Sequence, residues 1–164
     1  YKKLRNILAQ DLLERILKKD PGFFEALVIK LLVAMGYGGS LNEAAGIVVG
    51  KSGDEGIDGI IKEDKLGLDN IYIQAKRWNN VVERPEVQKF VGALAGKGAT
   101  KGIFITTSSF SRGAREFKPQ NNIKIVLIDG NQLCEYMIDY NIGVFTANTF
   151  EVKRIDIDFF ESEE

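Results

Sequence analysis

Two short apolar runs separated by a helical segment are the feature that most restricts how this chain can fold. Residues 103–106 and 125–128 are apolar or β-branched almost throughout, and the residues between them predict a helix near 111–117. A strand, a helix and a second strand in this order favour parallel pairing. Parallel strands are normally covered by helices on both faces. The chain is therefore expected to be an α/β protein.

The remaining pattern predicts more helices and strands around the same sheet. Apolar residues at helical spacing predict a helix over 1–19, which proline and glycine end at 21–22. A second helix, over 23–35, is apolar nearly all round and is expected to pack centrally. Strands are expected over 45–49, 57–62 and 70–76, followed by a helix over 85–97 and a helical pattern around 133–138. The result is a mixed central sheet between helices.

An acidic, glycine-flanked turn lies next to the second of these strands. Residues 53–59 read Gly-Asp-Glu-Gly-Ile-Asp-Gly, and the following strand ends in Gln74-Ala75-Lys76-Arg77. Alternation along a strand places Gln74 and Lys76 on one face, roughly 7 Å apart. A polar loop punctuated by Gly67 joins the two strands and predicts an antiparallel pair. Such a pair would bring Asp58 next to Gln74 and Lys76.

These three side chains suit metal-assisted hydrolysis of a phosphodiester. A hard cation such as Mg²⁺ prefers oxygen ligands and keeps several waters, so Asp58 and Gln74 are the proposed metal ligands. The cation would lower the pKa of a water and neutralise charge on the phosphate. Lys76 is the proposed catalytic lysine, which would position the attacking water or stabilise the developing charge. Mn²⁺ is a possible substitute for Mg²⁺.

The composition argues against several other chemistries. The chain has no histidine, which excludes histidine general bases and most zinc sites. Its one cysteine, Cys134, lies in an apolar helical pattern and is expected to be a buried thiol, in keeping with a reducing cytoplasm. No apolar run is long enough to span a membrane, and no signal peptide is indicated. Because the chain begins at Tyr1 without methionine, we expect a piece of a longer protein, with processing of the N-terminus as the alternative.

Charge is distributed unevenly, although the net charge is only −1. Residues 74–118 carry nine Lys or Arg and three acids, whereas residues 151–164 carry six acids and two bases. A basic segment beside the proposed site could neutralise DNA phosphates, or its residues could coat exposed helices. The candidate DNA contacts are Arg77, Lys101, Thr106, Ser108 and Arg112.

Three further sequence features have two readings each. Glu25 could serve the site or interact with the dipole of its helix as a first-turn acid. The hydroxyls at 106–109 could donate to phosphates or cap the next helix. Trp78 could stack on a base or sugar, or pack in the protein.

Asp58, followed after fifteen residues by Gln74-x-Lys76, resembles the active-site pattern of the PD-(D/E)xK nucleases. The glutamine variant looks like the Mrr family of type IV restriction endonucleases. Further matches, in order along residues 20–140, are Phe24-Glu25, Met35-Gly36-Tyr37-Gly38, Gly102-Ile103-Phe104-Ile105-Thr106-Thr107-Ser108 with Phe110-Ser111, and Leu127-Ile128-Asp129-Gly130.

The resemblance implies a restriction-endonuclease-like three-layer α/β/α sandwich with a mixed central sheet. It also implies a metal-dependent endonuclease that restricts modified, methylated double-stranded DNA as a homo-oligomer, most simply a dimer. Asp58 corresponds to the metal-binding aspartate, Gln74 to the usual second acid, Lys76 to the catalytic lysine and Glu25 to a helix glutamate at the site. A neutral Gln74 lowers the expected metal affinity.

Three segments are expected in the chain. Residues 1–20 would be a helix and linker from an upstream domain, 21–142 the nuclease catalytic domain, and 143–164 an extension with an acidic tail. Two rival functions stay open: another nuclease of the same fold, such as a junction resolvase or repair enzyme, and a DNA-binding module that does not cut. A third reading is a plain α/β domain in which Asp58 caps a turn and Lys76 is solvated.

Overall fold

A computed structural model describes residues 1–39, 46–48 and 56–161 of the chain. Within these residues, five strands form one sheet in the order β1-β2-β3-β4-β5. The strands are β1 (Gly46–Val48), β2 (Gly59–Lys62), β3 (Asn70–Lys76), β4 (Lys101–Thr106) and β5 (Lys124–Ile128). The pairs β1–β2 and β2–β3 are antiparallel, whereas β3–β4 and β4–β5 are parallel. The predicted mixed sheet is therefore confirmed.

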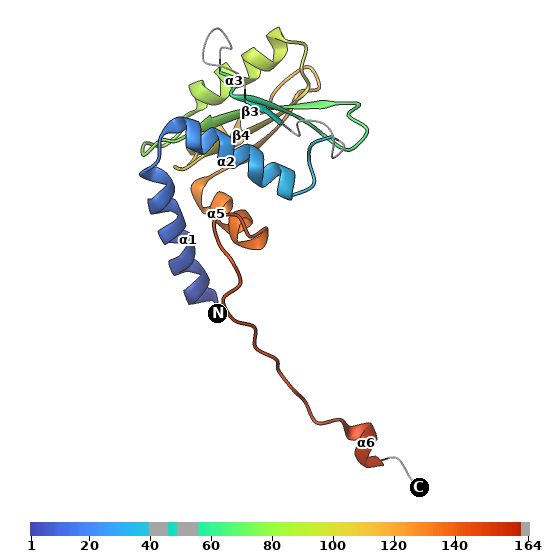
Figure 1. Ribbon diagram of the computed structural model, residues 1–164. Helices are drawn as coiled ribbons and strands as arrows, with labels where there is room; N and C mark the ends of the chain where they lie inside the picture. The colour runs from blue at the N-terminus through green and yellow to red at the C-terminus, as the bar shows by residue number, and fades with distance from the viewer. Residues whose placement is uncertain (40–45, 49–55, 162–164) are drawn as a thin grey trace.

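Helices cover both faces of this sheet (Figure 1). The helices are α1 (Lys2–Leu17), α2 (Pro21–Ala34), α3 (Arg84–Gly96), α4 (Arg112–Glu116), α5 (Gly130–Asp139) and α6 (Ile157–Glu161). One core cluster joins the sheet to α1, α2 and α5, and a second joins its other face to α3 and α4. The three-layer α/β/α architecture expected from the sequence is thus confirmed.

The two core clusters follow from the alternation within the strands. In β3, Ile71 and Ile73 belong to the cluster under α2, whereas Tyr72 packs with the cluster under α3. Gln74 and Lys76 follow Tyr72 at two-residue steps, so they share the α3 face of the strand. Cys134 is 1% exposed in the first cluster, and burial raises the pKa of its thiol to about 11. The predicted buried thiol is confirmed.

The second helix begins earlier than the sequence pattern indicates. Proline is favoured at the first helical position, and the Asp20 side chain accepts a hydrogen bond of 2.7 Å from the Phe23 N–H. The helix therefore starts at Pro21 and contains no acidic residue in its first turn. Glu25 lies in the second turn, so its reading as a first-turn acid is wrong.

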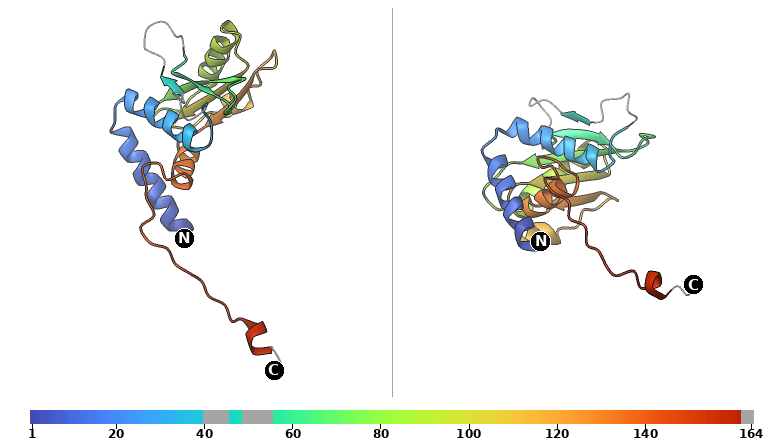
Figure 2. Two further views of the ribbon diagram at one scale, coloured as in Figure 1. Left: turned by 45° about the vertical axis from the view of Figure 1, so that its right-hand side comes forward. Right: turned by 60° about the horizontal axis from the view of Figure 1, so that its bottom comes forward.

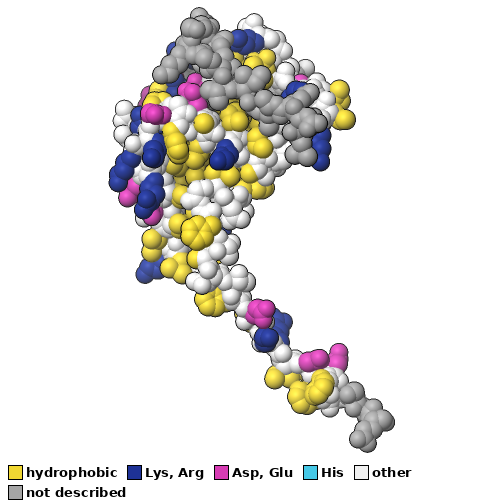
Figure 3. Space-filling view, in the orientation of Figure 1, with side chains coloured by type: hydrophobic (Ala, Val, Ile, Leu, Met, Phe, Trp, Pro, Cys, Tyr) yellow, Lys and Arg dark blue, Asp and Glu magenta, His cyan; other side chains and the backbone are white. Residues whose placement is uncertain are grey.

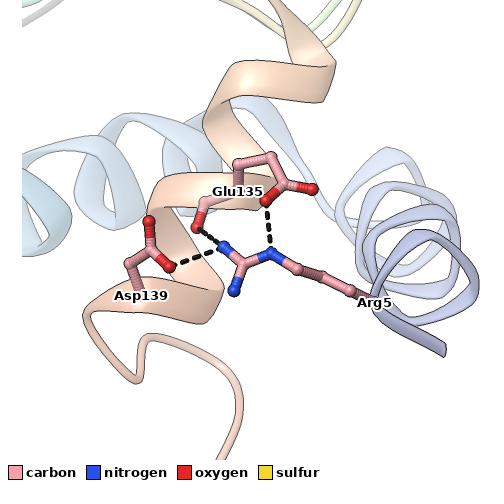
Figure 4. A network of polar contacts seen from close by, with 3 residues as sticks. All are labelled: Arg5, Glu135 and Asp139. Carbon is pink, nitrogen blue, oxygen red and sulfur yellow. Dashed lines mark hydrogen bonds and ion pairs between the residues drawn. The ribbon is translucent and has the colours of Figure 1, made fainter. Parts of the chain in front are cut away.

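Helix α1 is fastened to α5 by a polar network as well as by apolar contacts. Figure 4 shows the Arg5 guanidinium reaching the carboxylates of Glu135 and Asp139, and it also donates to the Glu135 carbonyl at 3.1 Å. Leu12 and Ile16 of the same helix are buried in the first core cluster. Residues 2–17 therefore pack against the rest of the molecule.

Beyond Val144 the chain runs away from the sheet and its helices. Both views in Figure 2 show an extended segment that ends in the short helix α6. The residues of α6 are all exposed, and Figure 3 shows apolar side chains along this segment. No helix in the described ranges is long and apolar enough to cross a membrane.

Candidate active site

The site is built where β2 begins and β3 ends. The pairing of Gly59 with Ile73 sets the register, and the Asp58 N–H continues it by donating to the Ile73 carbonyl at 2.7 Å. This places the Asp58 side chain beside the last residues of β3. The Gln74 amide donates to Asp58 Oδ2 at 2.7 Å, and the Ala75 N–H donates to the same oxygen at 2.8 Å. The predicted juxtaposition of Asp58 and Gln74 is therefore present in the structure.

Three effects act on the protonation of Asp58. Burial is the largest and raises the pKa of the carboxyl above its usual value. The hydrogen bond from the Ala75 N–H and the charge of Lys76 act in the opposite direction, because both stabilise the carboxylate. Asp58 thus lies in a partly desolvated position and also within the electrostatic field of Lys76.

Lys76 ends β3 and extends its side chain over an aromatic ring. Its ammonium nitrogen lies 5.1 Å from the centre of the Trp78 ring. Its backbone carbonyl accepts hydrogen bonds from the Thr106 hydroxyl, at 2.9 Å, and from the Thr107 N–H, at 3.2 Å. The end of β3 is consequently fixed by residues at the end of β4, while Lys76 is half-buried on the same face as Gln74.

A glycine gives the Gln74 amide its room. Gly56 has φ +83°, and a Cβ added there would lie 3.1 Å from Gln74 Oε1. Gly56 is the described end of the acidic turn predicted from sequence; residues 53–55 of that turn lie outside the described part of the chain. The Gln74 side chain is 3% exposed, so its amide is held between Asp58 and this turn.

The oxygens at this position fit a hard cation. Both hydrogen bonds described for the Asp58 carboxylate end on Oδ2, which leaves Oδ1 for a ligand. In a strand the N–H and C=O of one residue point to the same side, so the Ala75 carbonyl faces the same edge as Asp58. Across residues 1–39, 46–48 and 56–161, no three Asp, Glu, Cys or His side chains converge on one point. Asp58 Oδ1 and the Ala75 carbonyl oxygen are the donors present, and the Gln74 amide oxygen lies on the side of Gly56.

Glu25 is half-buried in α2, the helix that packs on β1, β2 and β3. Its proposed role at the site stays a prediction.

The predicted DNA contacts are spread over several parts of the fold. Thr106 is fully buried, and its hydroxyl donates to Lys76 rather than to solvent. Arg77 donates to the Leu17 carbonyl at 3.1 Å, toward the opposite face from Lys76. Lys101 lies at the other end of β4 from Thr106, in ion pairs with Glu63 and Asp69.

Arg112 and Ser108 are nearer the surface. Arg112 is exposed on α4 and pairs with Glu116, and the half-buried Ser108 has its hydroxyl 3.4 Å from the Asn79 carbonyl. The capping reading of residues 106–109 is wrong, because Ser111 caps α4 by accepting from the Ala114 N–H at 3.1 Å. The five DNA contacts stay predictions.

Comparison with known proteins places this geometry in a family. The family model described as restriction endonuclease, the Mrr catalytic family, matches residues 16–137. The chain belongs to the restriction endonuclease family. The Mrr resemblance in the sequence motifs is thereby confirmed, and enzymes of this family generally use divalent metal ions.

A curated relative of this restriction endonuclease chain comes from Escherichia coli (strain K12). It is the type IV methyl-directed restriction enzyme EcoKMrr, 46% identical over 160 residues, which make up 98% of this chain and 51% of that protein. The chain therefore spans about half the length of this relative.

Two solved restriction endonucleases have the same fold. The MspJI restriction endonuclease, in complex with a 27-mer oligonucleotide, is 25% identical with a TM-score of 0.61, over 85% of this chain and 33% of its own. The DNA modification-dependent restriction endonuclease AspBHI is 20% identical with a TM-score of 0.61, over 85% of this chain and 36% of its own. The α/β class expected from the sequence agrees with both.

The candidate site contains one relation that the sequence motifs do not predict. Trp78 is half-buried in the second core cluster, as its packing reading requires, and it also contacts the ammonium of Lys76. The position of Trp78, two residues after Lys76, could have predicted this contact, because residues at this spacing share a face of an extended chain.

Proposed function

We propose that this chain is the catalytic part of a restriction endonuclease that hydrolyses phosphodiester bonds of modified, methylated double-stranded DNA. The observation that carries the proposal is the convergence of Asp58, Gln74 and Lys76 at the end of β3, with 2.7 Å between the Gln74 amide nitrogen and Asp58 Oδ2. Membership of the restriction endonuclease family supports the same reading.

Each of the three side chains has a distinct proposed role. Asp58 presents Oδ1 as a ligand for Mg²⁺, with Mn²⁺ as a substitute. A divalent cation, when bound, neutralises charge on the phosphate and acidifies a water molecule. Lys76 holds the attacking water or donates to a phosphate oxygen as negative charge develops. Glu25 is proposed to complete the site from α2.

Gln74 would have to turn its amide to offer an oxygen to a cation. In the structure its amide donates to Asp58, so the nitrogen rather than the oxygen faces the carboxylate. Turning the amide about its last torsion exchanges the two atoms and brings an oxygen ligand beside Asp58. Because this ligand is neutral, the site carries one negative charge less than a pair of carboxylates, and we expect weak metal binding.

The remaining parts of the proposal concern the whole protein. Cutting both strands of a duplex is most simply done by two sites related by two-fold symmetry, so we propose a homodimer acting in the cytoplasm. Residues 21–142 are the proposed catalytic domain, with 1–20 leading from an upstream domain and 143–164 as an extension. Arg77, Lys101, Ser108 and Arg112 are the proposed DNA contacts, of which Arg112 is exposed, whereas the predicted contact Thr106 is fully buried.

The test is cleavage of supercoiled plasmid, methylated or unmethylated, with Mg²⁺, Mn²⁺ or chelator. We expect metal-dependent nicking by the wild type and its loss in Asp58→Ala and Lys76→Ala. Asp11→Ala and Lys3→Ala, on exposed positions of α1, are the matched controls and should cut normally.

Preference for methylated plasmid would support a restriction role, and preference for a branched substrate would favour a resolvase. Equal inertness of wild type and variants, together with metal binding that does not depend on Asp58, would overturn the catalytic proposal in favour of a DNA-binding module.

A further inference from the structure

Among the described residues, the Lys76 ammonium rests on an aromatic ring and not on a carboxylate. Its nitrogen lies 5.1 Å from the centre of the Trp78 ring. It also acts on Asp58 through its charge, but no ion pair between the two forms in the described part of the chain. An ammonium over the face of an indole is attracted by the ring quadrupole and keeps its charge available.

The backbone that carries Trp78 is held in this place by hydrogen bonds. The Thr107 hydroxyl, which is buried, donates to the Trp78 carbonyl at 2.8 Å, while Thr107 N–H and Thr106 hydroxyl bind the Lys76 carbonyl. Between them, Arg77 is tied to the Leu17 carbonyl in the opposite direction. These bonds fix the backbone on both sides of Arg77, so the indole and the lysine stem meet on one face.

We propose that Trp78 is a positioning residue for Lys76. Its indole ring holds the Lys76 ammonium near Asp58 and Gln74 and leaves the positive charge of the ammonium unpaired. The inference rests on the proposed catalytic function of Lys76 and deepens it. An ion pair with Asp58 would occupy both a metal ligand and the catalytic cation, whereas a phosphate can draw the ammonium off an indole at small cost. Trp78 thereby reduces the freedom of a long, flexible side chain before substrate arrives.

A competing use of Trp78 is direct contact with DNA. The residue also lines a cleft of about 400 Å³. The other lining residues are Asn80, Val81, Glu83, Pro85 and Glu86. Stacking on a nucleotide would contribute to DNA affinity, whereas positioning of Lys76 would contribute to turnover. Stacking would therefore affect the dissociation constant for DNA, whereas positioning would affect the rate of cleavage.

The first measurement compares Trp78→Phe and Trp78→Leu with wild type in single-turnover cleavage and DNA binding. We expect Trp78→Leu to lower the cleavage rate about three- to tenfold with unchanged DNA affinity, and Trp78→Phe to recover most of that loss, because phenylalanine keeps a π-face. Phe117→Leu removes another cation–π pair, that of Arg84 and Phe117 at 5.3 Å, and is the matched control with normal cleavage. Circular dichroism establishes that each variant is folded.

The second measurement needs no cleavage, because Trp78 is the sole tryptophan. Its fluorescence is compared in wild type, Lys76→Met, which keeps the aliphatic stem, and Lys76→Arg, which keeps a cation. We expect Lys76→Met to change the emission and Lys76→Arg to stay close to wild type.

The outcomes separate this inference from the function on which it rests. Lost cleavage in Lys76→Met with a full cleavage rate in Trp78→Leu would overturn positioning while the nuclease proposal stands. A weaker DNA affinity with an unchanged rate in Trp78→Leu would also overturn positioning, in favour of stacking. Identical emission in all three Lys76 proteins would refute the contact itself. Normal cleavage by Lys76→Met would instead refute the catalytic role of Lys76, whatever the fluorescence shows.

Discussion

At the scale of single residues, Asp58 lies where burial disfavours the charged form of its carboxyl group. Burial raises the pKa of Asp58 above its usual 3.8, against the opposing effects of Ala75 and Lys76. The folded protein therefore holds the Asp58 proton more tightly than the unfolded chain. Stability linked to this group is complete below pH 3.8 and is lost as the pH rises through the raised pKa. A buried charge is tolerated here because the proposed chemistry needs it.

We expect Asp58→Asn to abolish cleavage and to unfold at higher denaturant concentration than wild type at neutral pH, without metal. The asparagine oxygen can still accept from Gln74 and Ala75, and the desolvated charge is removed. Denaturant unfolding in chelator from pH 3.5 to 7.5 measures the effect, which should shrink toward the acid end. A variant less stable than wild type at neutral pH would show that attraction to Lys76 outweighs burial.

At the scale of elements, close approach of the end of β4 to the start of α5 holds the strands that carry the site. A Cβ added at Gly130, the first residue of α5, would lie 2.2 Å from the Thr107 carbonyl oxygen. Thr107 is the residue that binds both Lys76 and Trp78 through its backbone and hydroxyl. The spacing of α5 from β4 is thus coupled to the geometry of the site.

Two glycine substitutions should consequently change the free energy of unfolding in opposite directions. Gly130→Ala should lower the free energy of unfolding by about 1–3 kcal/mol or more, because backbone has to shift. Gly92→Ala, on the exposed side of α3 with nothing within 4 Å of the added Cβ, should raise it by about 0.5–1 kcal/mol. Urea unfolding of both variants measures the difference. A tolerated Gly130→Ala would mean that α5 can move without cost.

At the scale of the whole molecule, the two ends of the chain differ in how they join the core. Helix α1 contributes the buried Leu12 and Ile16 and the Arg5 network to α5. By contrast, the six large apolar side chains from residue 150 onward are 61% to 91% exposed. These residues are Phe150, Val152, Ile155, Ile157, Phe159 and Phe160.

Removal of residues 1–17 should therefore lower the free energy of unfolding by roughly 3–6 kcal/mol, because burial of each of the two aliphatic side chains contributes about 1.5–3 kcal/mol. Truncation after Thr149 should leave the midpoint of thermal unfolding unchanged. Calorimetry on both proteins at two concentrations measures this. Two results together would show that the tail packs on a second copy: a lower midpoint of thermal unfolding in the truncated protein, and a midpoint of the full chain that rises with protein concentration.

Much of the fold and the centre of the site could be predicted from the sequence. The periodicities of the strands and helices are local, so most elements were found, with boundaries off by one or two residues at Pro21 and Gly59, whereas the short helix α6 was not predicted. The antiparallel hairpin of β2 and β3 follows from its short loop, and it alone brings Asp58 to Gln74. The family resemblance follows from the same motifs.

Only the tertiary structure decided how the side chains around that centre are used. The Thr106 hydroxyl binds Lys76, and Lys101 pairs with acids at the far end of the sheet, because parallel pairing of β3 with β4 joins residues about thirty positions apart. No local pattern encodes such contacts. The sequence by itself determined which chemical groups meet at the end of β3; packing between layers decided which of them stay available to a substrate.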